Sequence, residues 1–402
     1  MTIRSSAAAV APAWNLRGVS LMAFAHGASD LYSGIVPFVI FYDVTRAGLP
    51  PWCQGALAFL WYLTSSIAQP LVGAYSDRHG RWWFLPASVA LTAVAVSYAA
   101  MTGSFAVLAA CVIAGGFGSA VMHPEAGRYS SLLGGARRAS AISIYQIGGQ
   151  IGYGIGPIVA AALLAHGGAS SALAMSIPGI AAALGVAAVM PTFARHADAA
   201  QPRRHAAHAD EVKGVDRIAI GLLVASTALR YLTGAAFAFY LPNLLTARGL
   251  SLTATGAVVT GFLIAAAAGL YVGGATADRF GHARVAIVGL VLAVPPLLLA
   301  LAAHGATTVA LLLLGSALLS VQNAPGVALA QALLPRNLGM SLGLMNGVAF
   351  GIGSAGVAGI GVVVTRAGAD LALTLVALAP LCAALAYWIV DRRRQEGLRT
   401  PG

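Results

Sequence analysis

The stretch GAYSDRHGR occupies residues 73–81, and GATADRFGH occupies residues 274–282, a separation of 201 positions. The same offset, without any gap, matches further pairs of identical residues: Asp77 and Asp278, Ser119 and Ser320, Pro124 and Pro325, Ser140 and Ser341, and Gly152 and Gly353. Self-similarity at a fixed period indicates an internal duplication. We therefore expect two copies of one unit, each with a short charged loop after its second hydrophobic span.

The composition assigns both copies to the membrane. Hydrophobic residues make up 59% of the 402 residues, charged residues only 9%, and the mean hydropathy is +0.82, whereas about a quarter of the residues in soluble domains are charged. The apolar runs are about 20–28 residues long, the length that a helix needs to cross the hydrocarbon core. They are not the short alternating segments of a transmembrane barrel. We expect an all-α membrane protein.

Twelve spans are predicted, six in each copy. They lie near residues 17–42, 53–75, 82–101, 105–128, 139–165, 171–190, 217–246, 252–275, 283–303, 306–333, 338–364 and 369–390. The predicted domains are an N-terminal six-helix bundle (1–191), a polar cytoplasmic linker (192–216) and a C-terminal six-helix bundle (217–402), with the two bundles related by a pseudo-twofold axis. Parallel repeats of this kind are typical of secondary transporters whose substrate cavity lies between the halves.

The basic residues determine the predicted orientation. With the N-terminus inside, 19 of the 23 basic residues fall on cytoplasmic loops and tails, three (Arg46, Arg248 and Arg366) on outer loops, and Arg230 within a span. An excess of basic residues marks the cytoplasmic face, so both termini are expected in the cytoplasm. The net charge of +11 then lies beside anionic lipid, and we expect no nucleic-acid partner.

The cysteines predict neither a disulfide framework nor a metal site. Cys53, Cys111 and Cys382 lie far apart in the sequence and in or beside spans, without the spacing of zinc ligands. We expect no cofactor and no metal. The expected partners are a small-molecule substrate, protons and the lipid bilayer, and the protein is expected to be monomeric.

The duplicated loop is predicted to be a conformational latch. Glycines such as Gly73 and Gly80 let two helix ends approach closely and turn back. Asp77 and Asp278 can accept hydrogen bonds from a helix N-terminus or pair with an arginine. The basic residues assigned to the latch are Arg78, Arg81, Arg128 and Arg279. A solvated turn would explain one copy of the loop, but two equivalent copies argue for a shared role.

Ionisable residues occur within predicted spans of the first copy, where each polar group costs about 2.5–3.5 kcal/mol and therefore suggests a function. His26 and Asp30 share one face of the first helix. Glu125 is the leading candidate for proton coupling, because a carboxyl facing a cavity can bind a proton on the acidic side and release it inside. Its alternative role is a structural pair with Arg128. His26 and His123 either relay protons or are simply hydrogen-bonded inside the bundle.

The second copy does not keep the titratable residues of the fourth span. Shifted by 201 positions, His123 becomes Ala324 and Glu125 becomes Gly326. Proton chemistry is therefore expected in the N-terminal half, on Asp30, Glu125, His26 and His123.

The seventh span contributes Arg230, which lies next to Tyr231, the counterpart of Asp30 at the same offset. Asp30 and Arg230 are expected at nearly equivalent depth on either side of the cavity. They either form an ion pair in the empty carrier, or Arg230 binds an anionic group of the substrate.

Other polar and aromatic residues complete the predicted substrate site: Gln146, Gln150, Asn346 and Tyr145. In the fifth span, Gly152, Gly156 and Pro157 permit close helix packing and a bend. We predict that these three residues form a hinge.

The duplicated loop and the twelve-span layout resemble the major facilitator superfamily over the whole chain. Within it, the sequence is similar to the fosmidomycin-resistance exporters. The matching stretches are His26 with Asp30, HPEAGR at 123–128, QIGGQIGYGIGP at 146–157, Arg230 before Tyr231, and GLMNGVAFGIG at 343–353. The resemblance implies a proton-coupled antiporter that expels small organic compounds or drugs from a bacterial cytoplasm across the inner membrane by alternating access.

One departure from related antiporters limits this comparison. Many drug–proton antiporters of the superfamily carry an arginine early in the fourth span, and the corresponding stretch here, ACVIAGG at 110–116, has none. A proton mechanism must therefore come from the residues named above.

Other functions fit parts of the sequence. A proton-coupled importer of a small anionic metabolite would need the same protonatable site, with Arg230 binding the anion. A metal transporter would use His26, Asp30, His123 and Glu125 as ligands. An enzyme is disfavoured, because no His-Glu-x-x-His pattern and no activated serine is evident.

Overall fold

The computed structural model describes residues 14–69, 71–72, 75, 81–199, 216–334, 340–341 and 343–399, and this part of the chain contains helices and no strands. The N-terminal bundle comprises α1 (Leu16–Arg46), α2 (Trp52–Tyr62) with the π-helix η1 (Leu63–Ile67), α4 (Phe84–Ala99), α5 (Phe105–Leu133), the short η2 (Gly135–Arg137), α6 (Arg138–Gly167), η3 (Gly168–Met175) and α7 (Ser176–Ala199).

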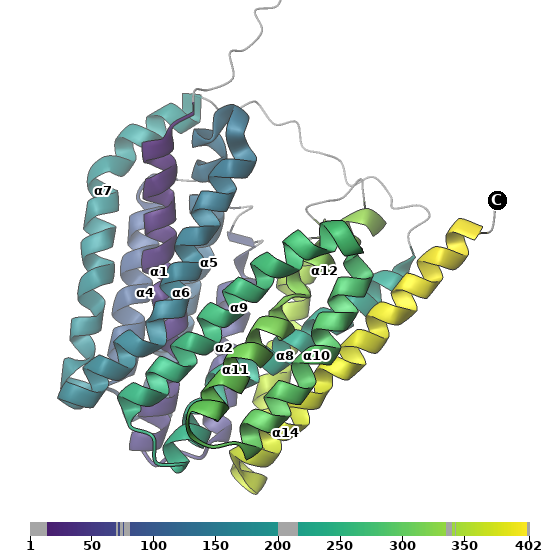
Figure 1. Ribbon diagram of the computed structural model, residues 1–402. Helices are drawn as coiled ribbons and strands as arrows, with labels where there is room; N and C mark the ends of the chain where they lie inside the picture. The colour runs from purple at the N-terminus through teal and green to yellow at the C-terminus, as the bar shows by residue number, and fades with distance from the viewer. Residues whose placement is uncertain are drawn as a thin grey trace, which may run out of the picture.

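The helices of the C-terminal bundle lie beside those of the N-terminal bundle (Figure 1). The C-terminal bundle comprises α8 (Arg217–Ala247), α9 (Leu252–Phe280), α10 (His282–Ala302), α11 (Gly305–Ser320), α12 (Asn323–Leu333), the π-helix η4 (Gly343–Val348) and α14 (Ala349–Arg399). Two spans are merged in α14, which bends at Gly368, where φ is 84°. This left-handed value favours glycine and marks the turn between the last two predicted spans.

The architecture confirms the all-α membrane fold. Seven helical segments of the described chain are long and apolar enough to cross a membrane, and two of them, Ser140–Arg195 and Ala349–Gln395, are long enough to contain two spans each. The boundaries differ from the predicted ones at the linker, because α7 continues to Ala199 although the sequence places the end of the bundle at 191. Polar residues continue the helix beyond the apolar span.

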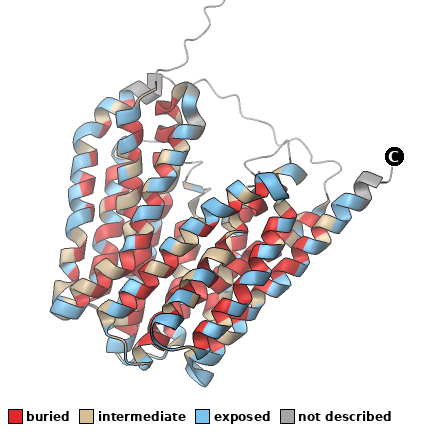
Figure 2. Cartoon of the chain, in the orientation of Figure 1, coloured by how far each residue is buried: buried red, intermediate tan, exposed pale blue. Residues whose placement is uncertain are grey.

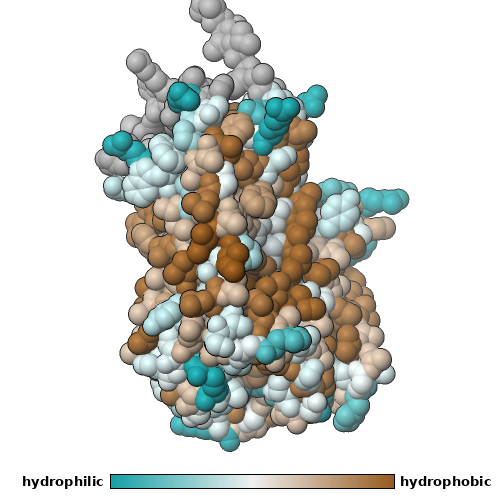
Figure 3. All heavy atoms as spheres, turned by 90° about the vertical axis from the view of Figure 1, so that its left-hand side faces the viewer, coloured by the Kyte–Doolittle hydropathy of each residue, from teal (hydrophilic) through white to brown (hydrophobic). Residues whose placement is uncertain are grey.

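The outer faces of the bundles are apolar, as lipid requires. Buried residues face the interior of each bundle and exposed ones face outward (Figure 2). The exposed residues include many large hydrophobic side chains, among them Leu71, Tyr271, Leu184 and Ile177. On the face of the N-terminal bundle, hydrophobic side chains occupy mainly the middle and hydrophilic ones mainly the ends (Figure 3). A surface of this kind is stable only in a bilayer.

The two bundles lie close together at one end and diverge toward the other (Figure 1). We call the diverging end the linker end, because α7 ends and α8 begins there. At the closed end, the backbone N–H of Trp52 donates to Thr365 Oγ1 at 2.8 Å, and that of Ile158 donates to Thr260 Oγ1 at 3.0 Å. These bonds join α2 to α14 and α6 to α9, so two seams hold the halves together.

The two seams differ in helix geometry. The α2–α14 seam contains the π-helices η1 and η4, which contact each other across the bundles. The α6–α9 seam consists of unbroken α-helices. Because π-turns are rare and weaken the regular hydrogen-bond ladder, the first seam is the less regular of the two.

The glycines of the predicted hinge are packing residues in this conformation. An added Cβ on Gly152 would meet the backbone oxygen of Gly27, and one on Gly156 would meet that of Leu31. The α6 helix runs through Pro157 without interruption. These glycines therefore let α6 lie directly against the α1 backbone, and bending at this position stays a prediction.

Candidate functional site

His26, Asp30 and His123 converge inside the N-terminal bundle. His26 Nε2 lies 3.0 Å from Asp30 Oδ2, and His123 Nε2 lies 3.4 Å from Asp30 Oδ1. The α1 helix supplies the first two residues at a four-residue spacing, which places them on one face, and α5 supplies His123. His26 is 3% exposed, whereas about a quarter of the His123 side chain is exposed (26%). The cluster is therefore more exposed on the His123 side than on the His26 side.

The backbone fixes the protonation pattern of both imidazoles. His26 Nδ1 lies 2.9 Å from the carbonyl oxygen of Tyr145, and His123 Nδ1 lies 2.8 Å from that of Ser119. A carbonyl oxygen only accepts, so each Nδ1 must carry the hydrogen. Both Nε2 atoms then point at the Asp30 carboxylate, where a bare lone pair would be repelled. Each short contact needs a shared proton or a bound cation.

His26 is held in place from both sides. The Tyr145 ring stacks on it with centroids 4.0 Å apart, and Gly149 leaves room for the imidazole, since an added Cβ would lie 2.7 Å from His26 Nδ1. The Tyr145 hydroxyl donates to the carbonyl oxygen of His123 at 3.3 Å. Tyr145, predicted as a substrate residue, is 5% exposed and supports the histidines in this conformation.

Glu125 forms a structural pair with Arg128, which is the alternative role that the sequence predicts for it. Its Oε2 accepts a hydrogen bond from Arg128 at 3.1 Å, and the Glu125 side chain is fully buried. The Arg128 guanidinium also lies over the Tyr129 ring, 4.4 Å from its centroid. Arg128, predicted to belong to the latch, is thus engaged within its own helix. The geometry favours Asp30 over Glu125 as the main protonatable carboxylate.

Arg230 does not form the ion pair with Asp30 that the sequence allows, because Asp30 pairs with the two histidines. Arg230 is 6% exposed. Within the described part of the chain, no carboxylate pairs with it and its Nε has no hydrogen-bond partner. Its Cζ lies 5.9 Å from the centroid of the Tyr231 ring, and Tyr153 and Tyr387 are close enough to interact with it electrostatically.

Aromatic rings from both bundles meet beside Arg230. Tyr231 stacks on Phe350 with centroids 4.1 Å apart and meets the edge of Tyr62 at 5.3 Å. The hydroxyl groups of Tyr62 and Tyr153 interact with each other. Tyr62 and Tyr153 belong to the N-terminal bundle, so this group of rings spans the boundary between the halves.

The sequence analysis did not single out Tyr62, Tyr153 or Phe350. Tyr153 lies within the stretch QIGGQIGYGIGP and Phe350 within GLMNGVAFGIG, two of the stretches that carry the family resemblance. Their importance depends on which side of each helix faces the cavity, and aromatic residues are too common in membrane helices to signal this alone.

A polar network behind Arg230 links three helices. Gln322 Nε2 donates to the Tyr387 hydroxyl at 2.5 Å and to Thr227 Oγ1 at 3.3 Å. Gln322 lies in the interruption between α11 and α12, and it is fully buried. Irregular backbone at membrane depth is tolerated where it is enclosed by protein or lines a cavity. These hydrogen bonds connect α8, which carries Arg230, to α14 and to the break between α11 and α12.

The other predicted substrate residues are less well defined. Gln146 and Gln150 are exposed on α6, on the same helical face as Tyr153, which reaches the aromatic group. Asn346 lies in η4, and its side chain falls outside the described residues. The structure therefore neither supports nor opposes a substrate contact for Asn346.

The predicted latch is described in one of its two copies. Gly73, Asp77, Arg78 and Gly80 fall outside the described residues, and Arg81 is exposed.

In the second copy, the contacts recorded for the loop residues Asp278 and Arg279 lie within the C-terminal bundle. Asp278 is 81% exposed and lies 3.9 Å from His282, while Arg279 lies over the Phe280 ring. Gly281, with φ of 92°, makes the turn into α10.

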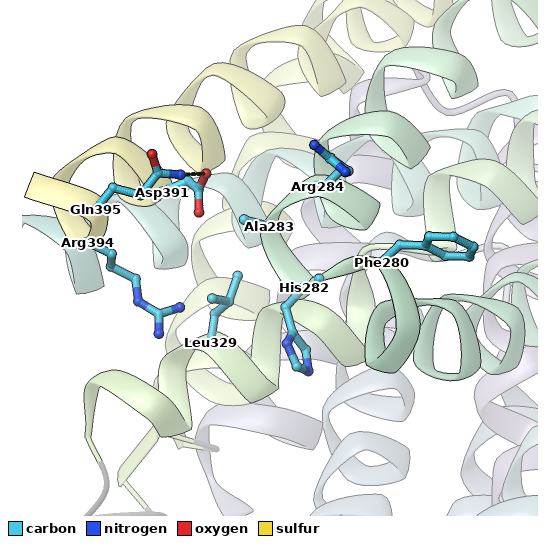
Figure 4. A pocket seen from close by; sticks show the side chains of 9 residues that line it. Phe280, His282, Ala283, Arg284, Leu329, Asp391, Arg394 and Gln395 are labelled. Atoms are coloured by element: carbon cyan, nitrogen blue, oxygen red, sulfur yellow. Dashed lines mark hydrogen bonds between the residues drawn. The ribbon is translucent and has the colours of Figure 1, made fainter. Parts of the chain in front are cut away.

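The second loop lines a hollow at the linker end. Phe280, His282, Ala283, Arg284 and Leu329, together with Asp391, Arg394 and Gln395 of α14, line a cavity of about 440 Å³ (Figure 4). Gln395 Nε2 donates to Asp391 Oδ2 at 2.8 Å. In this conformation the loop contacts its own bundle.

Comparison with known proteins bears on the family and the fold. A family model described as Major Facilitator Superfamily matches residues 19–221 and 223–402. The chain is 31% identical over 351 residues to the fosmidomycin resistance protein of Escherichia coli (strain K12), covering 85% of each chain. It is 28% identical over 385 residues to the uncharacterized MFS-type transporter YfnC of Bacillus subtilis (strain 168), covering 94% of this chain and 93% of the relative.

Solved structures share the fold at low sequence identity. A bacterial homologue of the human lysosomal transporter Spinster, in an inward-facing and occupied conformation, matches with a TM-score of 0.78 and 14% identity, covering 94% of this chain and 97% of the other. A bacterial homologue of the iron transporter ferroportin, in an inward-facing state, matches with a TM-score of 0.71 and 14% identity, covering 94% and 99%.

Proposed function

Because the chain belongs to the Major Facilitator Superfamily and is therefore a multi-pass membrane transporter, we propose that it exports small organic compounds, such as fosmidomycin, in exchange for protons. It works by alternating access in the bacterial inner membrane, with both termini in the cytoplasm. Fosmidomycin is chosen because one relative, 31% identical to this chain, is the fosmidomycin resistance protein of Escherichia coli. The family and the fold are those of transporters and not of enzymes.

The cluster of His26, Asp30 and His123 is the observation that carries this proposal. Both Nδ1 hydrogens are committed to backbone carbonyls, so proton exchange is left to the Nε2 atoms and the carboxylate. Removing the proton from His123 Nε2, on α5, puts a lone pair 3.4 Å from the Asp30 carboxylate on α1, an unfavourable contact at low dielectric. The distance between α1 and α5 thus depends on how many protons the cluster holds.

Proton binding is linked to helix position in this way, and helix position determines which side of the membrane the cavity faces. The described conformation diverges at the linker end, which we assign to the cytoplasm (Figure 1). In the proposed cycle, protons enter the cluster from the outside and leave it toward the cytoplasm while substrate binds. Similarity to two structures solved in inward-facing states supports this assignment.

A metal carrier is the second candidate, and one observation favours it. Ligand atoms of His26, Asp30 and His123 lie within 4.8 Å of one another, and imidazole and carboxylate suit divalent transition metals. Hydrogen bonds from each Nδ1 to a carbonyl oxygen would also fix metal-ligating histidines. Only three protein ligands converge in the described part of the chain, and no second carboxylate is among them.

Inside-out membrane vesicles test the proposed direction of transport. Acidifying the lumen should drive accumulation of radiolabelled fosmidomycin in the wild type, and Asp370→Asn, which changes an exposed carboxylate at the closed end, should behave like the wild type. Release of preloaded compound under the same gradient would instead indicate an importer. Accumulation of manganese or zinc that is lost in His26→Ala would indicate the metal carrier.

A further inference from the structure

We propose that Arg230 binds the acid group of the substrate, so that the carrier selects small organic anions with a planar or unsaturated body. This inference rests on the proposed function and defines its substrate class. Arg230 lies on α8 at the boundary between the bundles, beside the rings of Tyr153 and Tyr231.

The absence of a counter-charge carries the argument. Arg230 is only 6% exposed, and its Nε has no hydrogen-bond partner among the described residues. A buried guanidinium without an anion is costly. Arg230 nevertheless lies near the middle of a span, thirteen residues after the start of the 31-residue α8. At about 1.5 Å per residue this lies about 20 Å from the helix end, too far for the side chain to reach the membrane surface.

Other buried charges of the described chain have partners. Glu125 pairs with Arg128, Asp43 pairs with Arg46, and Asp30 contacts two histidines. Arg230 is therefore exceptional among the charges at membrane depth. A structural role would supply it with a carboxylate, whereas a role in binding leaves the anion to be supplied by the substrate.

The rings around Arg230 define the rest of the ligand. Tyr231 and Phe350 form a stacked pair, and Tyr62 meets Tyr231 edge-on. Such surfaces accept flat or unsaturated groups. Phenol hydroxyl groups can donate to the remaining oxygens of a phosphonate or carboxylate.

The site draws on both halves of the transporter. Arg230 and Tyr231 come from α8, while Tyr62 and Tyr153 come from α2 and α6 of the other bundle. An anion bound at Arg230 thus contacts both bundles at once, near the middle of α8. Substrate binding would hold the bundles together around this site, as transport through an occluded state requires.

Equilibrium binding to the full-length protein in nanodiscs tests the proposal. The probes are fosmidomycin, a panel of small phosphonic, carboxylic and sulfonic acids, and the uncharged ester of each acid. We expect the wild type to bind at least one acid at least about 30-fold more tightly than its ester, and Arg230→Gln to lose about 30-fold or more in affinity for that acid. Arg230→Lys should recover part of the loss, and Arg248→Gln, at the closed end, should bind like the wild type.

Thermal unfolding separates this role from a structural one. Because Arg230→Gln removes an uncompensated buried charge, its melting temperature should equal or exceed that of the wild type. A folded Arg230→Gln protein that binds the acid within about threefold of the wild type would overturn the proposal. Equal affinity for acid and ester, or no saturable binding of any acid, would overturn it as well. Acid binding through Arg230 without proton-driven accumulation would instead refute only the proposed coupling.

Discussion

The two halves of the molecule treat a buried charge at nearly the same depth in opposite ways. In the N-terminal half, Asp30 is flanked by two imidazoles at 3.0 and 3.4 Å. In the C-terminal half, Arg230 lies one residue before the counterpart of Asp30 and has no ion-pair partner among the described residues. One charge is neutralised within its own bundle, and the other is left for a ligand.

This difference assigns separate tasks to two copies of one scaffold. The first copy holds groups that gain and lose protons, and the second holds a cation that stays charged at any physiological pH. Proton binding and anion binding can then be changed independently by mutation, although both act on the same rigid-body movement.

The largest effect is expected for Asp30→Asn, which removes the carboxylate between the histidines. In inside-out vesicles at zero membrane potential, two pH units can drive up to about 100-fold accumulation at one proton per substrate, since each unit is worth about 1.36 kcal/mol. We expect the Asp30→Asn ratio to fall to about 1. Accumulation at the wild-type ratio would remove Asp30 from the coupling mechanism.

A smaller effect is expected for Gly149→Ala, which keeps every titratable group but crowds His26. Displacing the imidazole from Asp30 should lower the initial rate of proton-driven efflux on the order of 10-fold and change its pH profile. Gly127→Ala, a helical glycine with nothing within 4 Å of the added Cβ, is the matched control. Equal behaviour of the two variants would argue against positioning of His26 by Gly149.

Glu125→Gln distinguishes the two carboxylates of the N-terminal half. Because Glu125 pairs with Arg128, its loss should destabilise the fold, by up to about 3–5 kcal/mol for a fully buried pair, and lower the melting temperature. The accumulation ratio per folded molecule should stay within about twofold of the wild type. Loss of proton-driven accumulation with retained stability would restore Glu125 as the coupling site.

The smallest effects are expected at the closed end. Thr365→Val removes the acceptor of the Trp52 N–H, and Thr260→Val removes that of the Ile158 N–H. A neutral hydrogen bond contributes about 0.5–1.5 kcal/mol, so each change should shift the population of the described conformation by about 2- to 10-fold. If the α2–α14 seam rearranges more easily than the α6–α9 seam, Thr365→Val will shift the population of the described conformation less than Thr260→Val does.

Distances between spin labels can report this shift. Labels at Arg195 and Arg284, both exposed near the linker end, would be introduced after replacement of Cys53, Cys111 and Cys382. Both threonine variants should reduce the long-distance population. An unchanged distance distribution in both would show that these bonds do not hold the closed end.

The fold was predictable because lipid imposes strict rules on sequence. Apolar runs of span length predict the helices, and the repeat at 201 residues predicts the duplication, whereas the arginine asymmetry predicts the orientation in the membrane, which stays a prediction. The equivalent prolines Pro124 and Pro325 behave differently, since α5 continues through the first while the helix before the second is interrupted between α11 and α12. The local sequence does not reveal whether a helix continues through its proline or is interrupted near it, because packing against neighbouring helices decides this.

The site was predictable in part. His26, Asp30 and His123 could be named from their cost in a membrane, and the structure brings these three together. The sequence does not show which of Glu125 and Asp30 is the coupling carboxylate, because this depends on how α5 is rotated about its axis. That rotation places position 123 toward α1 and position 125 toward Arg128. The absence of a partner for Arg230 depends on every neighbouring helix at once, and no pattern within α8 can show it.

Counterflow of radiolabelled fosmidomycin across proteoliposomes at equal pH on both sides tests the separation of tasks most directly, because exchange needs substrate binding but no net proton movement. The account predicts that Asp30→Asn retains counterflow near the wild-type rate, whereas Arg230→Gln loses it. Loss of counterflow in a folded Asp30→Asn protein, or its survival in Arg230→Gln, would contradict the account.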